Sequence, residues 1–174
     1  IEEGDVIEMG GRTWDIRVDH GHAPDHASFW SRSDNLVLSG DQVIASISSN
    51  IGVYPTEPDA NPLAEWMNSC ARLQEFATAD HLALPGHKLP FIGMPLRLKQ
   101  LLENHHGALD RLRADLKSPK TAGEIMLAVF KRNIGDGEYG LGLVEALAHC
   151  NYLWHAGEAS RTLDQDGAYR WVIK

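Results

Sequence analysis

Apolar and polar positions alternate with a period of two in the first part of the chain. Between residues 12 and 19 every second side chain is apolar, which is the pattern of a half-buried strand. Shorter strand-like runs follow at residues 27–31 and 36–38, each after a polar or glycine-containing segment. Three strands so close together in sequence predict an antiparallel meander.

The hydrophobic period becomes that of a helix after residue 61. Asn61-Pro62 is a typical helix start, and apolar side chains recur at helical spacing from there to about Ala79. The preceding residues 45–60 are rich in Ser, Asn, Gly and Pro and predict a long surface loop. Residues 81–84 then predict a short buried strand that stops at Pro85.

The second half of the chain has mainly helical patterns. Apolar positions from Leu96 to Leu116 predict one long helix with a single buried stripe. Thr121 and Glu124 have the spacing of a capping box before a short helix, and another helix is predicted from about 141 to 155. Two strand-like segments around Asp164–Gly167 predict a terminal hairpin. This order of helices and hairpin is that of a winged-helix module.

These elements predict an α+β protein with two domains, residues 1–92 and residues 93–174. No stretch of the sequence has the length of uninterrupted apolar residues that a membrane span requires, and no signal peptide is visible at the start. Cys70 and Cys150 have no CxxC partner, so we expect reduced thiols and a cytoplasmic location.

The charge distribution disfavours nucleic acid as a partner. The net charge is −8, and residues 1–92 carry 5 basic against 14 acidic side chains, which repels phosphates. The expected last helix contains no Lys or Arg, so it lacks the basic face of a groove-reading helix. A small-molecule substrate is the expected ligand class.

Three chemically active side chains follow predicted strands directly. His22, Asp41 and His87 each come after a glycine at the end of a strand, where side chains from one sheet edge can converge. Imidazole nitrogens and a carboxylate are donors that bind zinc in hydrolytic sites. The sequence therefore predicts a metal site formed by these three residues, against the alternative of three unrelated loop residues.

The motifs around these residues resemble those of the metallo-β-lactamase superfamily. The stretch Gly21–His26 has the form GHxPxH, and it is followed by Ser39-Gly40-Asp41 and then by Pro85-Gly86-His87. The resemblance implies a dinuclear zinc site in the complete enzyme. His22 would be a ligand of the first metal, Asp41 a bridging and catalytic carboxylate, and His87 a ligand of the second, with His26 in the second layer of residues around the metals. The implied reaction is attack of a metal-bound hydroxide on an ester, thioester, lactam or phosphodiester.

One motif of that superfamily, HxHxDH, is absent from this sequence. The only HxH is His20-Gly21-His22, and its surroundings differ from the motif. The resemblance therefore implies the C-terminal half of an αββα sandwich followed by a winged-helix-like extension. We expect such a chain to be inactive alone. Without its N-terminal half, an apolar layer that includes Trp14, Ile16 and Val18 would be uncovered, so we expect the chain to bind that half or a second copy of itself.

Two other functions remain open from the sequence. One is a non-catalytic interaction or oligomerisation module that uses the long helix and the wing. The other is part of a metallo-β-lactamase-fold nuclease, for which basic side chains on the long helix would contact phosphates; these are Arg97, Lys99, Arg111, Arg113 and Lys117. His105, His149 and His155 lie within predicted helices, and we interpret them as structural histidines. Tyr54 in the long loop is a candidate substrate contact.

Overall fold

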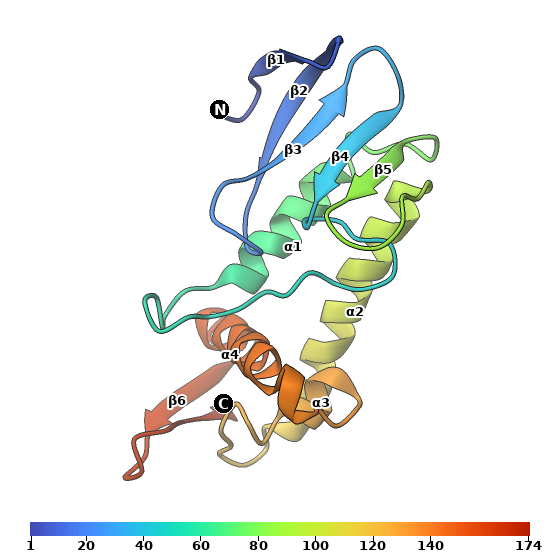
Figure 1. Ribbon diagram of the computed structural model, residues 1–174. Helices are drawn as coiled ribbons and strands as arrows, with labels where there is room; N and C mark the ends of the chain where they lie inside the picture. The colour runs from blue at the N-terminus through green and yellow to red at the C-terminus, as the bar shows by residue number, and fades with distance from the viewer. The chain divides into compact units, whose positions relative to one another are not determined.

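The structure is a computed structural model that describes all residues 1–174, and it contains a five-stranded sheet, four α-helices and a separate two-stranded hairpin (Figure 1). The strands are β1 (Val6–Met9), β2 (Arg12–Asp19), β3 (His26–Ser31), β4 (Leu36–Gly40), β5 (Leu82–Pro85), β6 (Ala159–Leu163) and β7 (Tyr169–Ile173). The helices are α1 (Pro62–Leu73), α2 (Met94–Asp115), α3 (Met126–Phe130) and α4 (Tyr139–His155), with a single 3₁₀ turn at Asp136–Glu138. The predicted α+β class is confirmed.

The predicted meander is present as β2, β3 and β4. β2 pairs antiparallel with β3 from Trp14 opposite Ser31 to Asp19 opposite His26. β3 in turn pairs antiparallel with β4. A short strand that the hydrophobic pattern did not reveal, β1, adds the outer edge by pairing with β2, and it is mostly exposed.

β5 joins the sheet next to β4, and this pair is parallel. Leu36, Val37 and Leu38 lie opposite Leu82, Ala83 and Leu84. The carboxyl ends of parallel strands meet at the same edge of the sheet. The backbone N–H of Gly86 donates to the carbonyl of Gly40 at 2.9 Å, which fixes the two strand ends beside each other. Asp41 follows Gly40 and His87 follows Gly86, so both residues lie at the same edge of the sheet.

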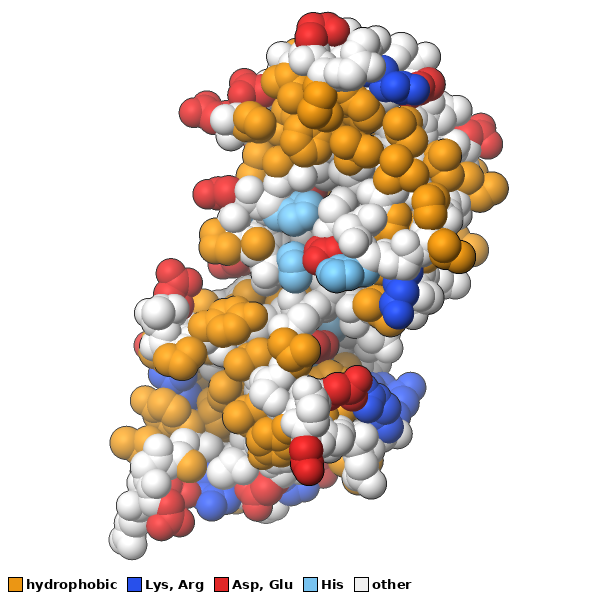
Figure 2. Space-filling model, viewed as in Figure 1, with side chains coloured by type: hydrophobic (Ala, Val, Ile, Leu, Met, Phe, Trp, Pro, Cys, Tyr) orange, Lys and Arg blue, Asp and Glu red, His pale blue; other side chains and the backbone are white.

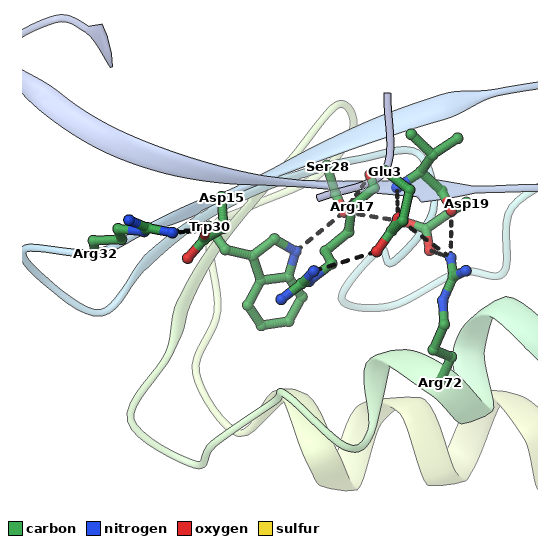
Figure 3. A network of polar contacts seen from close by, with 9 residues as sticks. Glu3, Asp15, Arg17, Asp19, Ser28, Trp30, Arg32 and Arg72 are labelled. Atoms are coloured by element: carbon green, nitrogen blue, oxygen red, sulfur yellow. Dashed lines mark hydrogen bonds and ion pairs between the residues drawn. The ribbon is translucent and has the colours of Figure 1, made fainter. Parts of the chain in front are cut away.

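Helices cover the sheet face that carries the polar side chains of β2. Figure 3 shows α1 and α2 on the same side of the strands as Asp15, Arg17 and Asp19. Arg17 lies over the ring of Phe76 at 4.1 Å, and Arg72 on α1 pairs with Asp19 at 3.2 Å. The helix predicted to reach Ala79 ends at Leu73, because residues 74–76 turn back at its end and bring Phe76 under Arg17.

The opposite sheet face has no helix over it and is apolar. The register places Phe29, Leu36, Leu38, Leu82 and Leu84 on this face. Leu82 is 40% exposed and the other four are partly exposed. Figure 2 shows apolar side chains gathered over the sheet. The sequence suggested that Trp14, Ile16 and Val18 would be uncovered on this layer, but all three are buried within the chain itself. The uncovered area lies over β3 to β5 instead.

The chain divides into two compact units. The first contains residues 1–49 and 65–102, and the second contains residues 50–64 and 103–174. The division lies within α2, between residues 102 and 103, whereas the sequence placed the domain boundary between residues 92 and 93, and the loop segment 50–64 belongs to the second unit. The winged-helix assignment of the second part stays a prediction.

The second unit contains a buried polar cluster. His105 and His149 are 1% and 0% exposed, and their ring nitrogens Nδ1 and Nε2 lie 3.2 Å apart. Their interpretation as structural core histidines is confirmed, whereas His155 is exposed and hydrogen bonds the carbonyl of Asp59. Burial lowers the pKa of His105 to about 3 and that of His149 to about 4. Both rings are therefore neutral at pH 7.

A carboxyl group lies on the same helix as His149. The Asn50 side-chain amide donates to Glu145 Oε2 at 3.1 Å and to the Leu141 carbonyl at 3.2 Å. The N–H of Val53 donates to the Val144 carbonyl, so the segment from Asn50 lies along α4. Burial raises the pKa of Glu145 to about 7.

None of the helices is long and apolar enough to cross a membrane.

The raised pKa of Glu145 makes a testable prediction about stability. A buried acid that is favoured in its protonated form contributes stability below its unfolded pKa, and this contribution is lost as pH rises through about 7. Glu145→Gln keeps an acceptor for Asn50 and does not ionise. Between pH 5 and pH 8 the variant should therefore gain up to about 3 kcal/mol in unfolding free energy relative to the unaltered chain. Urea unfolding at several pH values measures this gain.

The control for this experiment is Glu57→Gln, because Glu57 is exposed on the loop segment of the same unit. Its difference from the unaltered chain should not change with pH. A constant difference for Glu145→Gln across the same range would show that Glu145 is ionised in the folded protein at neutral pH.

Candidate metal centre

The first site loop is anchored at the end of β2. Asp19 is completely buried and accepts hydrogen bonds from the Ser28 hydroxyl at 3.0 Å and from Arg72 at 3.2 Å (Figure 3). Arg72 also donates to the Val18 carbonyl. The next residue, His20, donates its backbone N–H to the Ser69 hydroxyl at 2.9 Å. These bonds fix the start of the loop that carries His22.

The structure brings His22, Asp41 and His87 together. Asp41 Oδ2 lies 3.6 Å from His22 Nε2 and 3.3 Å from His87 Nε2. The side chains of His22 and Asp41 are about one quarter exposed, and His87 is 66% exposed. Figure 2 shows histidine side chains gathered around an acidic side chain on one face. The predicted convergence of the three residues is therefore observed, and their role as metal ligands stays a prediction.

Two glycines make room for this arrangement. A Cβ on Gly86 would overlap Asp41 Oδ1, so the close approach of this carboxylate requires glycine there. Gly40 has φ +49°, and its Cβ would lie 2.5 Å from His26 Nε2. Gly40 therefore meets two constraints, a left-handed backbone and a close histidine ring. Gly86, in contrast, has no left-handed backbone and is required for space alone.

His26 contacts the site from behind. The backbone N–H of Asp41 donates to His26 Nε2 at 3.2 Å, so this nitrogen is an acceptor and is not turned toward the three side chains. Burial, together with the nearby His22, lowers the pKa of His26. A neutral ring with a lone pair on Nε2 is the form that can accept this bond. His26 thus contacts the backbone of Asp41, and its place in a second layer around metal ions stays a prediction.

The donor set leaves capacity for a cation. Asp41 Oδ1 is buried and has no hydrogen-bond partner. An acceptor oxygen buried without a partner carries a desolvation cost that a bound cation would offset. Two imidazoles and a carboxylate suit zinc chemically. No group of three or more His, Cys, Asp or Glu side chains is arranged to close around a metal ion, and the distances above are those of loose ion pairs.

Other candidates from the sequence lie apart from this cluster. The side chain of His20 is 44% exposed, and its Nδ1 lies 3.7 Å from Asp25 Oδ1. Sequence reasoning missed the supporting residues Asp19, Ser69 and Arg72. The available signal was Asp19, the acidic residue at the end of an alternating strand and directly before the histidine loop. Alternation alone places this side chain on the polar face of the strand.

The basic residues of α2 are largely engaged within the protein. Arg97 donates to the carbonyls of Ile44 and Ile47, and Arg111 donates to those of Gly107, Ala128 and Val129. Arg113 pairs with Glu158 at 2.6 Å. Guanidinium groups committed in this way are not free for phosphates, which weakens the nuclease interpretation.

Family comparisons agree with the motifs. Residues 1–87 match the model of the metallo-beta-lactamase superfamily, and residues 109–174 match that of the metallo-beta-lactamase-like C-terminal domain. Among curated proteins, the probable metallo-hydrolase YqjP of Bacillus subtilis is 26% identical over 88% of this chain and 48% of its own length. The atrochrysone carboxyl ACP thioesterase of Aspergillus fumigatus is 28% identical over 70% of this chain and 26% of its own length.

Solved structures show the same fold along the whole chain. A beta-lactamase domain protein from Burkholderia ambifaria is 37% identical with a TM-score of 0.94, over 100% of this chain and 52% of its own. A metallo-beta-lactamase family protein from Thermus thermophilus is 29% identical with a TM-score of 0.85, over 100% of this chain and 54% of its own. The chain thus spans about half the length of these relatives. With the ordered motifs, the fold and the family match in agreement, the chain belongs to the metallo-beta-lactamase superfamily, a family of hydrolases.

Proposed function

We propose that this chain supplies part of the active site of a zinc-dependent hydrolase. The observation that carries the proposal is the convergence of Asp41 Oδ2 with the Nε2 atoms of His22 and His87, beside an Asp41 Oδ1 that has no partner. In the full-length protein, ligands that this sequence does not contain would complete the site.

Zinc held by these residues would act as a Lewis acid, polarising a carbonyl or phosphoryl oxygen and lowering the pKa of water. The chain's own residues have simpler tasks. His22 and His87 offer imidazole nitrogens, and Asp41 offers a carboxylate whose second oxygen has no hydrogen-bond partner. His26 holds the Asp41 backbone and thereby sets the direction of its side chain.

The substrate class follows from the superfamily's chemistry and from the named relatives. Attack on an ester, thioester, lactam or phosphodiester is within reach of such a site. One relative is named a thioesterase and another a probable metallo-hydrolase, which supports a carbonyl substrate. The engaged arginines of α2 argue against a phosphodiester polymer. A fold alone does not select a substrate. We place thioesters and esters first because of the relative that is named a thioesterase.

A non-catalytic interaction module is the second candidate. Its supporting observation is the partly exposed apolar face formed by Phe29, Leu36, Leu38, Leu82 and Leu84. Such a face favours packing against another sheet. The two functions are compatible, because an interface there would join this chain to the rest of a hydrolase.

The hydrolase proposal predicts zinc-dependent activity of the full-length protein. The zinc-loaded protein should hydrolyse a simple thioester, and Asp41→Asn should reduce kcat/KM by at least about a hundredfold. The 174-residue chain alone should show no zinc-dependent turnover, because the HxHxDH ligands are not in its sequence. Full activity of Asp41→Asn, or no activity of the zinc-loaded full-length protein on any of the four substrate classes, would overturn the proposal.

Gly86→Ala tests the carboxylate position directly. The added Cβ would displace Asp41 Oδ1, so zinc affinity of the full-length protein should fall by about tenfold to a hundredfold with little change in Tm. Competition with a chromophoric chelator measures the affinity. Gly137→Ala is the matched control, because nothing lies within 4 Å of its Cβ position. Equal zinc affinity of the two variants would show that Asp41 does not bind the metal.

The apolar sheet face predicts self-association of the isolated chain. We expect sedimentation velocity to show dimers or larger species at tens of micromolar. Leu82→Lys, placed on the uncovered face, should shift the distribution toward monomer. Leu163→Lys, on an exposed apolar residue of the hairpin, should leave it unchanged. A monomeric unaltered chain would contradict this prediction.

A further inference from the structure

We propose that the segment Lys88–Leu96, which follows His87, selects substrates that combine a hydrocarbon chain with a carboxylate or phosphate group. This proposal rests on the hydrolase function above and names the substrate class of the same site. Its basis is the charge, exposure and backbone of this segment.

Lys88 is the one cation of its region that has no internal partner. Residues 1–92 contain four arginines and a single lysine. Each arginine is ion-paired: Arg12 with Asp34, Arg17 with Glu3, Arg32 with Asp15 and Arg72 with Asp19. The Lys88 ammonium has no hydrogen bond or ion pair and is next in sequence to His87. It is therefore free to pair with an anionic group of a substrate bound next to His87.

The backbone holds Lys88 in an unfavourable conformation. Its φ is +69°, in the left-handed region that favours glycine, and only two other non-glycine residues of the chain share this feature. The chain around it is fixed. Gly86 bonds Gly40, Phe91 exchanges hydrogen bonds with Ala83 at 2.8 and 3.1 Å, and Gly93 bonds Ala79. A lysine side chain kept at such a position points to a role beyond the turn itself.

Exposed apolar side chains follow Lys88 closely. Leu89 is 78% exposed, Ile92 is 70% exposed and Leu96 is 62% exposed. Apart from Ile1, no large apolar residue of the chain is as exposed as these three. They stand on the fixed segment that leaves the site, so the hydrocarbon part of a bound substrate would cover them.

The positive charge of Lys88 is what an anionic substrate would need in this acidic region. The region 1–92 is strongly acidic and repels anions at long range. An anionic ester or thioester would need a local, unpaired cation near the reacting carbonyl, and Lys88 is the residue that can provide it. The apolar side chains beyond Lys88 then fit the chain of an acyl group.

The test uses the zinc-loaded full-length protein and matched thioesters. The substrates are S-octanoyl N-acetylcysteamine, which is neutral, S-octanoyl 3-mercaptopropionate, which carries a carboxylate, and S-octanoyl 4′-phosphopantetheine, which carries a phosphate. We expect kcat/KM for at least one anionic substrate to exceed that for the neutral one about fivefold, with the ratio falling as salt rises. The substrate with the higher ratio identifies the anion. A ratio of one for both would overturn the proposal.

Variants assign the effect to this segment. Lys88→Met should bring the ratio to about one, and Lys88→Arg should retain it. Lys88→Gly should also lose the ratio without lowering Tm, which separates the charge from folding. Lys99→Met, on the exposed face of α2, is the control and should keep the ratio. An unchanged ratio in Lys88→Met would overturn the anion role.

The apolar part has its own readout. Leu89→Ser with Ile92→Ser should lower the preference for octanoyl over acetyl thioesters about fivefold, and equal preference before and after would overturn the apolar role. Calorimetric binding of the unreactive thioether S-octyl 3-mercaptopropionate does not depend on turnover. If it binds and loses affinity in Lys88→Met while no thioester is hydrolysed, the anion site stands and the hydrolase proposal fails.

Discussion

The candidate centre depends on the parallel pairing of β4 with β5. This pairing joins segments about forty residues apart and ends both strands at one edge, where the Gly86 N–H bonds the Gly40 carbonyl. A slip of one residue would reverse the faces of β5 and turn Ala83 from the buried layer toward the open one. The same strand register therefore buries Ala83 in the inner layer and brings Asp41 next to His87. The glycine at each strand end removes the side chain that would block the meeting.

A second constraint lies beneath β2, and it is electrostatic. Burial raises the pKa of Asp19, while hydrogen bonds from Ser28 and Arg72 act in the opposite direction. A buried carboxylate without such partners would cost several kcal/mol, so the network must stay intact for β2 to end where it does. Because His20 and its bond to Ser69 follow immediately, the same network sets the origin of the loop that carries His22.

Local patterns predicted the elements well, and long-range packing accounts for the differences. Alternation located β2. Thr121 and Glu124 exchange the reciprocal bonds of a capping box, but they close a turn, and the predicted short helix α3 begins only at Met126 without a side-chain cap. Alternation defines two strand faces but does not say what covers each, so Asp19 was assigned to solvent and Trp14 to an uncovered layer. The early end of α1 and the burial of Glu145 depend equally on contacts that local sequence does not encode. The order of three short motifs did predict the convergence of His22, Asp41 and His87.

The charges of the first unit divide into those used by the fold and those left over. Its arginines in residues 1–92 are all committed to carboxylates at the sheet or its edges, where they hold strands and helix together. The acidic excess that remains favours cations near the site, and it opposes anions. In the proposed hydrolase, this acidic excess would favour the approach of a metal ion. Discrimination among the proposed substrates would then depend on the few uncommitted groups beside the site, so a single lysine in a left-handed turn would affect specificity more than its exposed position suggests.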